Sequence, residues 1–238
     1  MPYPVRTGFH TPCGPRVTSE RRPNVDAPAR ESYAGGMGFL ARMGSWLEGG
    51  DGLADPAEIH ITQIGDEVYN AHAPGATANC GPSAVIMAMR LVGAAIPGED
   101  RYHGEELISH VRQLATGEAN RLRGTTAIHL LRVLRLAGCE GRQLTHTKDM
   151  LRAVTRGEPV IMGGNPAVPG TYTERFDYLD IRRYDSGHWI VVSRFNPETR
   201  NFIVNDPQST IGPIEATVDE LYRFSSRDGG IGLAVRRA

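Results

Sequence analysis

The sequence predicts an α+β fold, in which helices come first along the chain and antiparallel strands follow. Apolar residues recur at helical spacing between residues 82 and 155. Short apolar runs bounded by turn residues then take over from about residue 159. The 238 residues contain no internal repeat and are enough for one full domain with an extension.

The first predicted helix, residues 82–91, is an almost continuous apolar run that follows a Cys-Gly-Pro triplet. Proline suits a first helical turn, because its missing N–H would have no partner there. In the helix predicted over residues 125–137 we expect Thr126 to act as the cap and Gly138 to end the helix. The other predicted helices cover residues 104–114, 147–155 and 218–224.

A short strand is predicted over residues 58–64, where apolar and polar residues alternate. Residues 195–200 carry turn-forming residues and are expected to join two strands in a hairpin. A hairpin brings the start of its first strand and the end of its second to one edge of the sheet. The remaining predicted strands cover residues 159–162, 188–194, 201–205 and 231–235.

Composition divides the chain into two parts. Residues 1–56 are rich in Pro, Gly and Arg and have little apolar periodicity, so we expect a flexible N-terminal extension. Residues 57–238 are expected to form the folded domain.

Charge and composition exclude several classes of partner. The formal net charge of −1 gives no reason to expect nucleic acid or an anionic membrane as a partner. No apolar run approaches the roughly 20 residues of a membrane span, and no secretory signal opens the chain. The three cysteines are sparse and odd in number, which suits a reducing compartment. Lys148 is the only lysine among 26 basic residues, a bias typical of a GC-rich bacterial genome.

Cys80 is the candidate nucleophile, because it stands where the buried helix begins. The positive end of the helix dipole favours a thiolate, and the thiolate is the nucleophilic form of cysteine. His188 opens a predicted strand after Gly187, and we expect it to act as the base. Cysteine, histidine and carboxylate together provide a nucleophile, its base and the group that orients the base.

Asp206 is the candidate orienting residue for His188, because the hairpin brings both strand ends to one edge. Asn205 competes for this role, but alternation along a strand places 205 and 206 on opposite faces, so only one of them can serve. Gln63 is the candidate side-chain oxyanion donor beside the backbone N–H of Cys80. Asn70 and Asn79 are alternatives to Gln63.

No cofactor or metal is expected. The histidines and cysteines form no close-spaced ligand set and no HExxH pattern. The Gly-Gly-Asn-Pro run at 163–166 lacks the Lys-Ser/Thr of a phosphate-binding loop, and we interpret it as the wall of a cleft or a plain turn.

Six segments follow one another along the chain: Gln63, Asn79-Cys80-Gly81-Pro82-Ser83-Ala84, Gly124-Thr125-Thr126, Gly157-Glu158-Pro159-Val160-Ile161, Gly187-His188-Trp189-Ile190-Val191-Val192 and Val204-Asn205-Asp206-Pro207. Their order resembles the papain-like cysteine peptidases, and among them the bacteriocin-processing, double-glycine-type family and its stand-alone bacterial relatives. The resemblance covers about residues 57–236.

The resemblance implies a papain-like fold, whose helical half carries the nucleophile and packs on an antiparallel sheet carrying His and Asp. It implies a Cys-His-Asp triad of Cys80, His188 and Asp206, with Gln63 as the oxyanion residue. The gap between Gln63 and Cys80 is longer than is usual in the family.

The function expected from this resemblance is hydrolysis of peptide bonds through an acyl-thioester intermediate. A deamidase, transglutaminase or acyltransferase of the same fold and a catalytically silent binding domain are the alternatives. With no transporter domain attached, the chain looks like a bacterial effector or toxin. It would then reside in the bacterial cytoplasm before signal-free secretion into a host or rival cell. A protein or peptide substrate and a cognate inhibitor or immunity protein are the partners that such a role implies.

Overall fold

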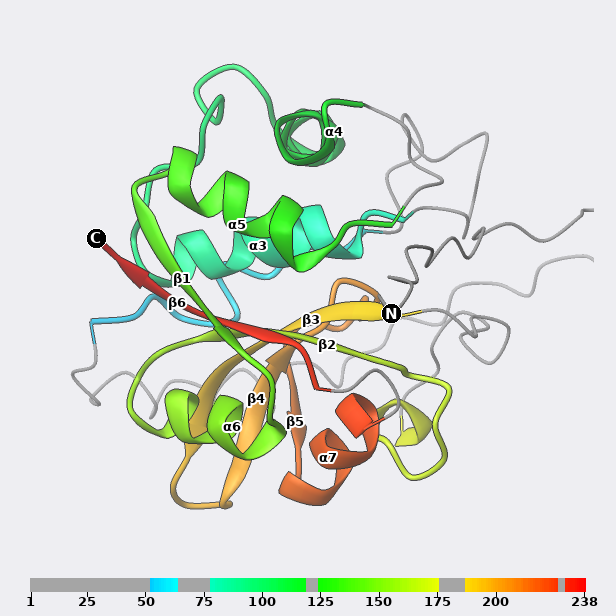
Figure 1. The fold of residues 1–238 in the computed structure, drawn as a ribbon. Coiled ribbons are helices and arrows are strands. Elements are labelled where there is room, and N and C mark those ends of the chain that lie inside the picture. Colours follow the sequence, from blue (N-terminus) through cyan, green and yellow to red (C-terminus); the bar gives the residue numbers. More distant parts are fainter. Residues whose placement is uncertain (1–51, 64–77, 119–123, 176–186, 227–229) are drawn as a thin grey trace, which may run out of the picture.

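A six-stranded antiparallel sheet separates two groups of helices in the computed structural model (Figure 1). The structure describes residues 52–63, 78–118, 124–175, 187–226 and 230–238. The strand order is β1-β6-β2-β3-β4-β5, and every neighbouring pair is antiparallel. The strands are β1 (Cys139–Leu144), β2 (Val160–Gly164), β3 (His188–Asn196), β4 (Asn201–Asn205), β5 (Ile214–Ala216) and β6 (Gly232–Arg237).

Helices cover both faces of this sheet. On one face α3 and α5 contact the strands, and α4 lies over these two helices (Figure 1). On the other face α6 and α7 pack against β2 and its neighbours. The helices are α3 (Cys80–Leu91), α4 (Gly104–Thr116), α5 (Ala127–Leu136), α6 (Thr147–Thr155) and α7 (Val218–Ser226), with a 3₁₀ turn, η2 (Tyr172–Arg175). Within the described part of the chain, no helix combines the length and the apolar character needed to cross a membrane.

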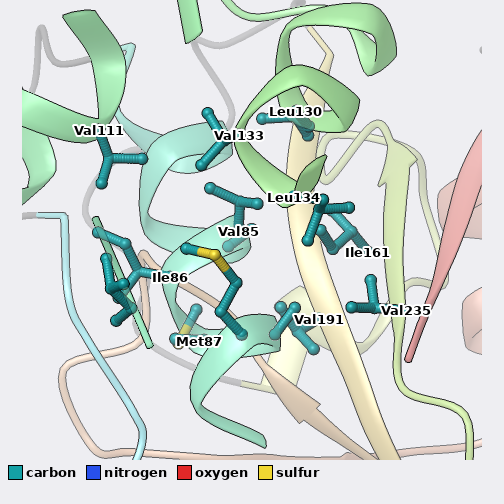
Figure 2. Packing of buried hydrophobic residues seen from close by; sticks show 14 of the residues in the cluster. Val85, Ile86, Met87, Val111, Leu130, Val133, Leu134, Ile161, Val191 and Val235 are labelled. Carbon is teal, nitrogen blue, oxygen red and sulfur yellow. The ribbon is translucent and has the colours of Figure 1, made fainter. Parts of the chain in front are cut away.

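Alternation along the strands builds a separate apolar core on each face of the sheet. Ile161 and Val191 belong to the core shared with α3, α4 and α5, whereas Met162 and Val192 belong to the core shared with α6 and α7. Figure 2 shows the first core, where Val85 of α3 lies among side chains from α5 and the strands. Since α3 is buried on all sides, it needs no polar face, which explains its continuous apolar sequence.

The α+β prediction is confirmed, and most predicted elements appear within two residues of their expected bounds. The first helix begins at Cys80 itself, so the cysteine lies in the helix and Pro82 in its first turn. Thr126 caps α5 through a reciprocal pair of hydrogen bonds with His129, and Gly138 follows with a φ of 68°. The hairpin between β3 and β4 is also present.

The strand predicted over residues 58–64 is wrong for the residues that are described, which are irregular. Ile59 belongs to the core around α3, and the Ile61 N–H donates to the Met87 sulfur at 3.3 Å. The alternating isoleucines therefore pack on a helix, and residues 58–63 pair with none of the described strands. Two strands were not predicted, β1 and β5, because β1 buries only its two end residues and β5 has three residues.

Residues 53–56 are tied to the domain by their backbone. The N–H of Ala54 donates to the Leu91 carbonyl at 3.0 Å, and the Pro56 carbonyl accepts from Asn205 Nδ2 at 2.7 Å. The division into an extension, 1–56, and a domain, 57–238, stays a prediction, since residues 1–51 lie outside the described part.

A close approach between β2 and α7 leaves no room for a side chain at Gly164. A Cβ there would lie 2.4 Å from two ring carbons and the carbonyl oxygen of Phe224. The next residue, Asn165, donates its N–H to that same carbonyl at 2.7 Å, so the two backbones cannot easily separate.

Gly164→Ala is therefore expected to lower the free energy of unfolding by about 1–3 kcal/mol or more, the usual cost of overpacking. Urea denaturation followed by circular dichroism measures the change. Gly124→Ala is the matched control, because a Cβ at Gly124 has no neighbour within 4 Å. Equal stability of the two variants would contradict this account.

Candidate active site

Three elements bring the predicted triad together. Cys80 is the first residue of α3, His188 is the first residue of β3, and Asp206 directly follows the last residue of β4. Adjacent antiparallel strands place the start of β3 and the end of β4 at one edge of the sheet. All three side chains are buried, with exposed fractions of 8% for Cys80, 4% for His188 and 0% for Asp206.

The strand register accounts for the contact between His188 and Asp206. Val191 pairs with Asn205, so one step further Asp206 lies opposite Ile190, on the face that His188 shares. From this diagonal position Asp206 Oδ1 lies 2.7 Å from His188 Nε2. With Nε2 bound to the carboxylate, Nδ1 is the ring nitrogen that remains for the thiol.

The Asp206 carboxylate is held by donors on both oxygens. The Tyr172 hydroxyl donates to Oδ2 at 2.8 Å, and the backbone N–H of Gln208 donates to Oδ1 at 2.8 Å. Burial alone would raise the pKa of Asp206, but the charge and hydrogen bond of His188, with the donors from Gln208 and Tyr172, lower it. The group therefore stays ionised while it is shielded from water.

Asn205 faces away from His188, as alternation requires. Its Nδ2 donates to the Pro56 carbonyl at 2.7 Å and lies 3.3 Å from His60 Nδ1, and its Oδ1 accepts from the Ser193 hydroxyl at 2.6 Å. The geometry thus brings Asp206, and not Asn205, next to the imidazole. Asn205 instead joins the segment around Pro56 to the sheet.

The environment of Cys80 favours its thiolate. Burial would raise the pKa of the thiol, but a hydrogen bond with His188, the charge of that residue, the backbone N–H of Trp189 and the charge of Arg112 together lower it. The position at the N-terminus of α3 acts in the same direction.

His188 is the positive partner of the Cys80 thiol. Burial alone would lower the pKa of His188, but the Asp206 charge and hydrogen bonds to Asp206 and Cys80 raise it to about 10. A thiolate facing a protonated imidazole is the arrangement of an activated cysteine nucleophile.

The backbone of Gln63 lies next to the segment that carries Asp206. Its backbone N–H donates to the carbonyl of Pro207 at 2.7 Å, one residue after Asp206, and its side chain is only 3% exposed. Of the alternatives, Asn79 directly precedes Cys80 and accepts a hydrogen bond from Arg112 Nε at 2.9 Å. Asn70 lies outside the described residues. The choice of Gln63 as oxyanion donor stays a prediction.

Trp189 connects the nucleophile with the loop before α5. Its backbone N–H lowers the pKa of the Cys80 thiol, and its indole N–H donates to the Thr125 carbonyl at 2.9 Å. Thr125 in turn covers Gly81, since a Cβ at Gly81 would lie 1.8 Å from Thr125 Oγ1. These contacts fix the first turn of α3 against β3.

No sequence motif pointed to Tyr172, whose hydroxyl donates to Asp206 from η2. Arg112 was also missed, although a signal was present. It falls on the apolar stripe of its helix with Ile108 and Ala115, where a charged residue is unexpected.

The run at 163–166 forms a strand end and a turn. Gly163 and Gly164 close β2, and Asn165 Oδ1 accepts from the Ala167 N–H at 2.8 Å. Among the described residues no group of three or more His, Cys, Asp or Glu side chains is arranged to hold a metal ion.

A cysteine at the N-terminus of a buried helix, facing a histidine and an acid on neighbouring antiparallel strands, defines the papain-like class of fold. The model of the Peptidase_C39 like family matches residues 61–224, a span that contains Gln63, Cys80, His188 and Asp206. The chain belongs to this family. No curated protein sequence matches it.

Several solved structures are similar to the chain. A double glycine motif protease from an AMS/PCAT transporter, in complex with the leader peptide, is 16% identical, with a TM-score of 0.45, and the match covers 75% of this chain and 91% of that one. The peptidase domain of Streptococcus ComA, a bi-functional ABC transporter involved in a quorum sensing pathway, is 19% identical, with a TM-score of 0.43 and coverage of 74% and 96%. The N-terminal peptidase C39 like domain of a toxin secretion ATP-binding protein from Vibrio parahaemolyticus is 18% identical, with a TM-score of 0.40 and coverage of 67% and 97%.

Gly81→Ala is expected to displace the first turn of α3, because the new methyl group would overlap the Thr125 hydroxyl. The expected result is a loss of about 1–3 kcal/mol of stability and slower alkylation of Cys80 by iodoacetamide. Thermal unfolding and mass spectrometry of the alkylated peptide measure the two effects.

Thr125→Ala in the Gly81→Ala background is the rescue variant. It removes the overlapping oxygen, and the nearest remaining atom, Thr125 Cβ, lies 3.1 Å from the new methyl carbon. A double variant no more stable than Gly81→Ala alone would show that this contact does not limit the site.

Proposed function

We propose that this protein is a cysteine peptidase in which Cys80 is the nucleophile, His188 the general base and acid, and Asp206 the residue that orients His188. The observation that carries the proposal is the 2.7 Å hydrogen bond between His188 Nε2 and Asp206 Oδ1, which leaves the other ring nitrogen for the Cys80 thiol. Membership of a peptidase family supports the same reaction class.

The reaction begins from the thiolate–imidazolium pair, in which His188 Nδ1 already holds the proton of the Cys80 thiol. The thiolate then attacks the peptide carbonyl carbon, and the backbone N–H of Cys80 with the Gln63 side chain stabilises the oxyanion. As the C–N bond breaks, His188 gives its proton to the leaving amine, and an acyl thioester remains on Cys80.

The second half of the cycle releases the acid. His188 takes a proton from water, whose oxygen attacks the thioester carbonyl. The C–S bond breaks, the carboxylic acid leaves, and the thiolate–imidazolium pair is restored. Throughout both halves Asp206 keeps Nε2–H oriented and stabilises the imidazolium without taking its proton.

A protein or peptide substrate follows from this chemistry, because the site is built for acyl transfer from an amide. A role as a secreted effector or toxin, the bacterial location and a cognate inhibitor or immunity protein stay predictions.

Incubation of a proteome with wild type and with Cys80→Ala tests the reaction class. We expect new protein N-termini with wild type and none with Cys80→Ala, as measured by mass spectrometry of terminal peptides. Cys139→Ala is the matched control, since Cys139 is a second free, buried cysteine on β1, and it should cleave as wild type does. Cys80-dependent mass shifts of intact targets without new termini would instead identify a deamidase or acyltransferase. Equal behaviour of wild type and Cys80→Ala would contradict catalysis by this site.

Asp206→Asn is expected to change the pH profile as well as the rate. In wild type, kcat/KM should stay high until His188 deprotonates near its pKa of about 10. Because the Asp206 charge raises this pKa, its removal should move the alkaline limb to lower pH and reduce kcat/KM by up to about 10⁴-fold. Kinetics between pH 5 and pH 11 (roughly the range in which such groups titrate) measure both effects. An unchanged alkaline limb would refute the assigned role, and Asp149→Asn on α6 serves as the control.

A further inference from the structure

Arg112 of α4 is fully buried, with an exposed fraction of 0%. Arginine is almost never removed from water unless its charge and donors are satisfied. The position lies on the face of α4 that carries Ile108 and Ala115, and this helix packs against α3. A buried guanidinium at this place needs an explanation that packing alone does not provide.

The contacts of Arg112 are made to the residues that lead into the nucleophile. Its Nε donates to Asn79 Oδ1 at 2.9 Å, and a terminal nitrogen donates to the carbonyl oxygen of Ala78. Ala78 and Asn79 are the two residues before Cys80, so the planar fork of the guanidinium holds the segment from which α3 starts. Lysine carries its donors on one nitrogen and would not reproduce this fork.

The charge of Arg112 also acts on the thiol. A positive charge in a buried region is weakly screened and favours a neighbouring anion. Of the described charged groups packed around α3, His188 of β3 and Arg112 of α4 lower the pKa of Cys80, whereas burial raises it. Asp206 lies behind His188, and Glu105 is a buried carboxylate two turns earlier on α4.

We propose that Arg112 is a positioning residue for the nucleophile: its guanidinium holds the Ala78-Asn79 turn and keeps a fixed positive charge beside the Cys80 thiolate. The role rests on the proposed function, because it concerns the same thiol. Unlike the charge of His188, which changes during the reaction, the charge of an arginine side chain is fixed.

The test measures the rate of Cys80 alkylation by iodoacetamide against pH in the full chain. Mass spectrometry of peptides separates Cys80 from Cys13 and Cys139. For Arg112→Gln and Arg112→Met we expect the midpoint of the profile to rise by about one pH unit. The alkylation rate at acidic pH would then fall about tenfold, because a tenfold smaller fraction is thiolate. The plateau rate at alkaline pH should stay that of wild type.

Two further variants separate charge from fold. Arg112→Lys keeps the charge and should keep the midpoint within a few tenths of a unit, with a lower melting temperature. Arg90→Gln is the matched control, because Arg90 lies in the last turn of α3, at the end of the helix opposite Cys80, where it pairs with Glu99. This control should leave the profile unchanged.

The proposal is overturned if Arg112→Gln or Arg112→Met keeps the wild-type circular dichroism spectrum and also keeps the wild-type midpoint. A midpoint in Arg112→Lys as high as in the neutral variants would overturn the role of the charge. Alkylation needs no substrate, so the two proposals can fail separately. If the midpoint depends on Arg112 in a protein that cleaves nothing, only the proposed peptidase function is contradicted. If wild type cleaves and the midpoint is unchanged in the neutral variants, only the role of Arg112 is contradicted.

Discussion

The burial of α3 is the constraint on which the rest of this structure depends. Every residue of the helix except Arg90 is buried between α4, α5 and the sheet. A helix packed on all sides cannot shift along its axis without opening the core, so its N-terminus has a fixed place. That place is beside the edge where β3 begins and β4 ends, so the packing of α3 holds the Cys80 thiol there.

The site concentrates charge in a region that excludes water. Asp206 and Cys80 are both hydrogen-bonded to His188, and the charge of Arg112 also acts on the Cys80 thiol. Each charge is costly to bury alone. His188 is hydrogen-bonded to Asp206 and Cys80, and the guanidinium of Arg112 is hydrogen-bonded to Asn79 and Ala78. Holding these charges in one buried arrangement therefore lowers the stability of the fold, as is common at functional sites.

Much of this arrangement could be predicted from the sequence, because local signals determined it. Helical periodicity gave α4 and α6, turn residues gave the β3–β4 hairpin, and alternation separated Asn205 from Asp206. The failures came where tertiary packing decides. Ile59 and Ile61 alternate as in a strand but pack on α3, and only the two end residues of β1 are buried, so neither pattern reveals the structure that its residues adopt. Tyr172 and Arg112 reach the site from distant segments, and no local pattern encodes such a meeting.

Asn205 and Asp206 are chemically similar neighbours with opposite duties. Asn205 joins the Pro56 segment to the sheet, and Asp206 is hydrogen-bonded to His188. Because strand faces alternate, a one-residue slip of β4 that carries Asn205 to the position of Asp206 would set a neutral amide before the imidazole and turn the carboxylate to the opposite face. The register of one strand pair is therefore part of the chemistry. A misaligned hairpin could keep the outline of the fold and still turn an ionised site into a neutral one.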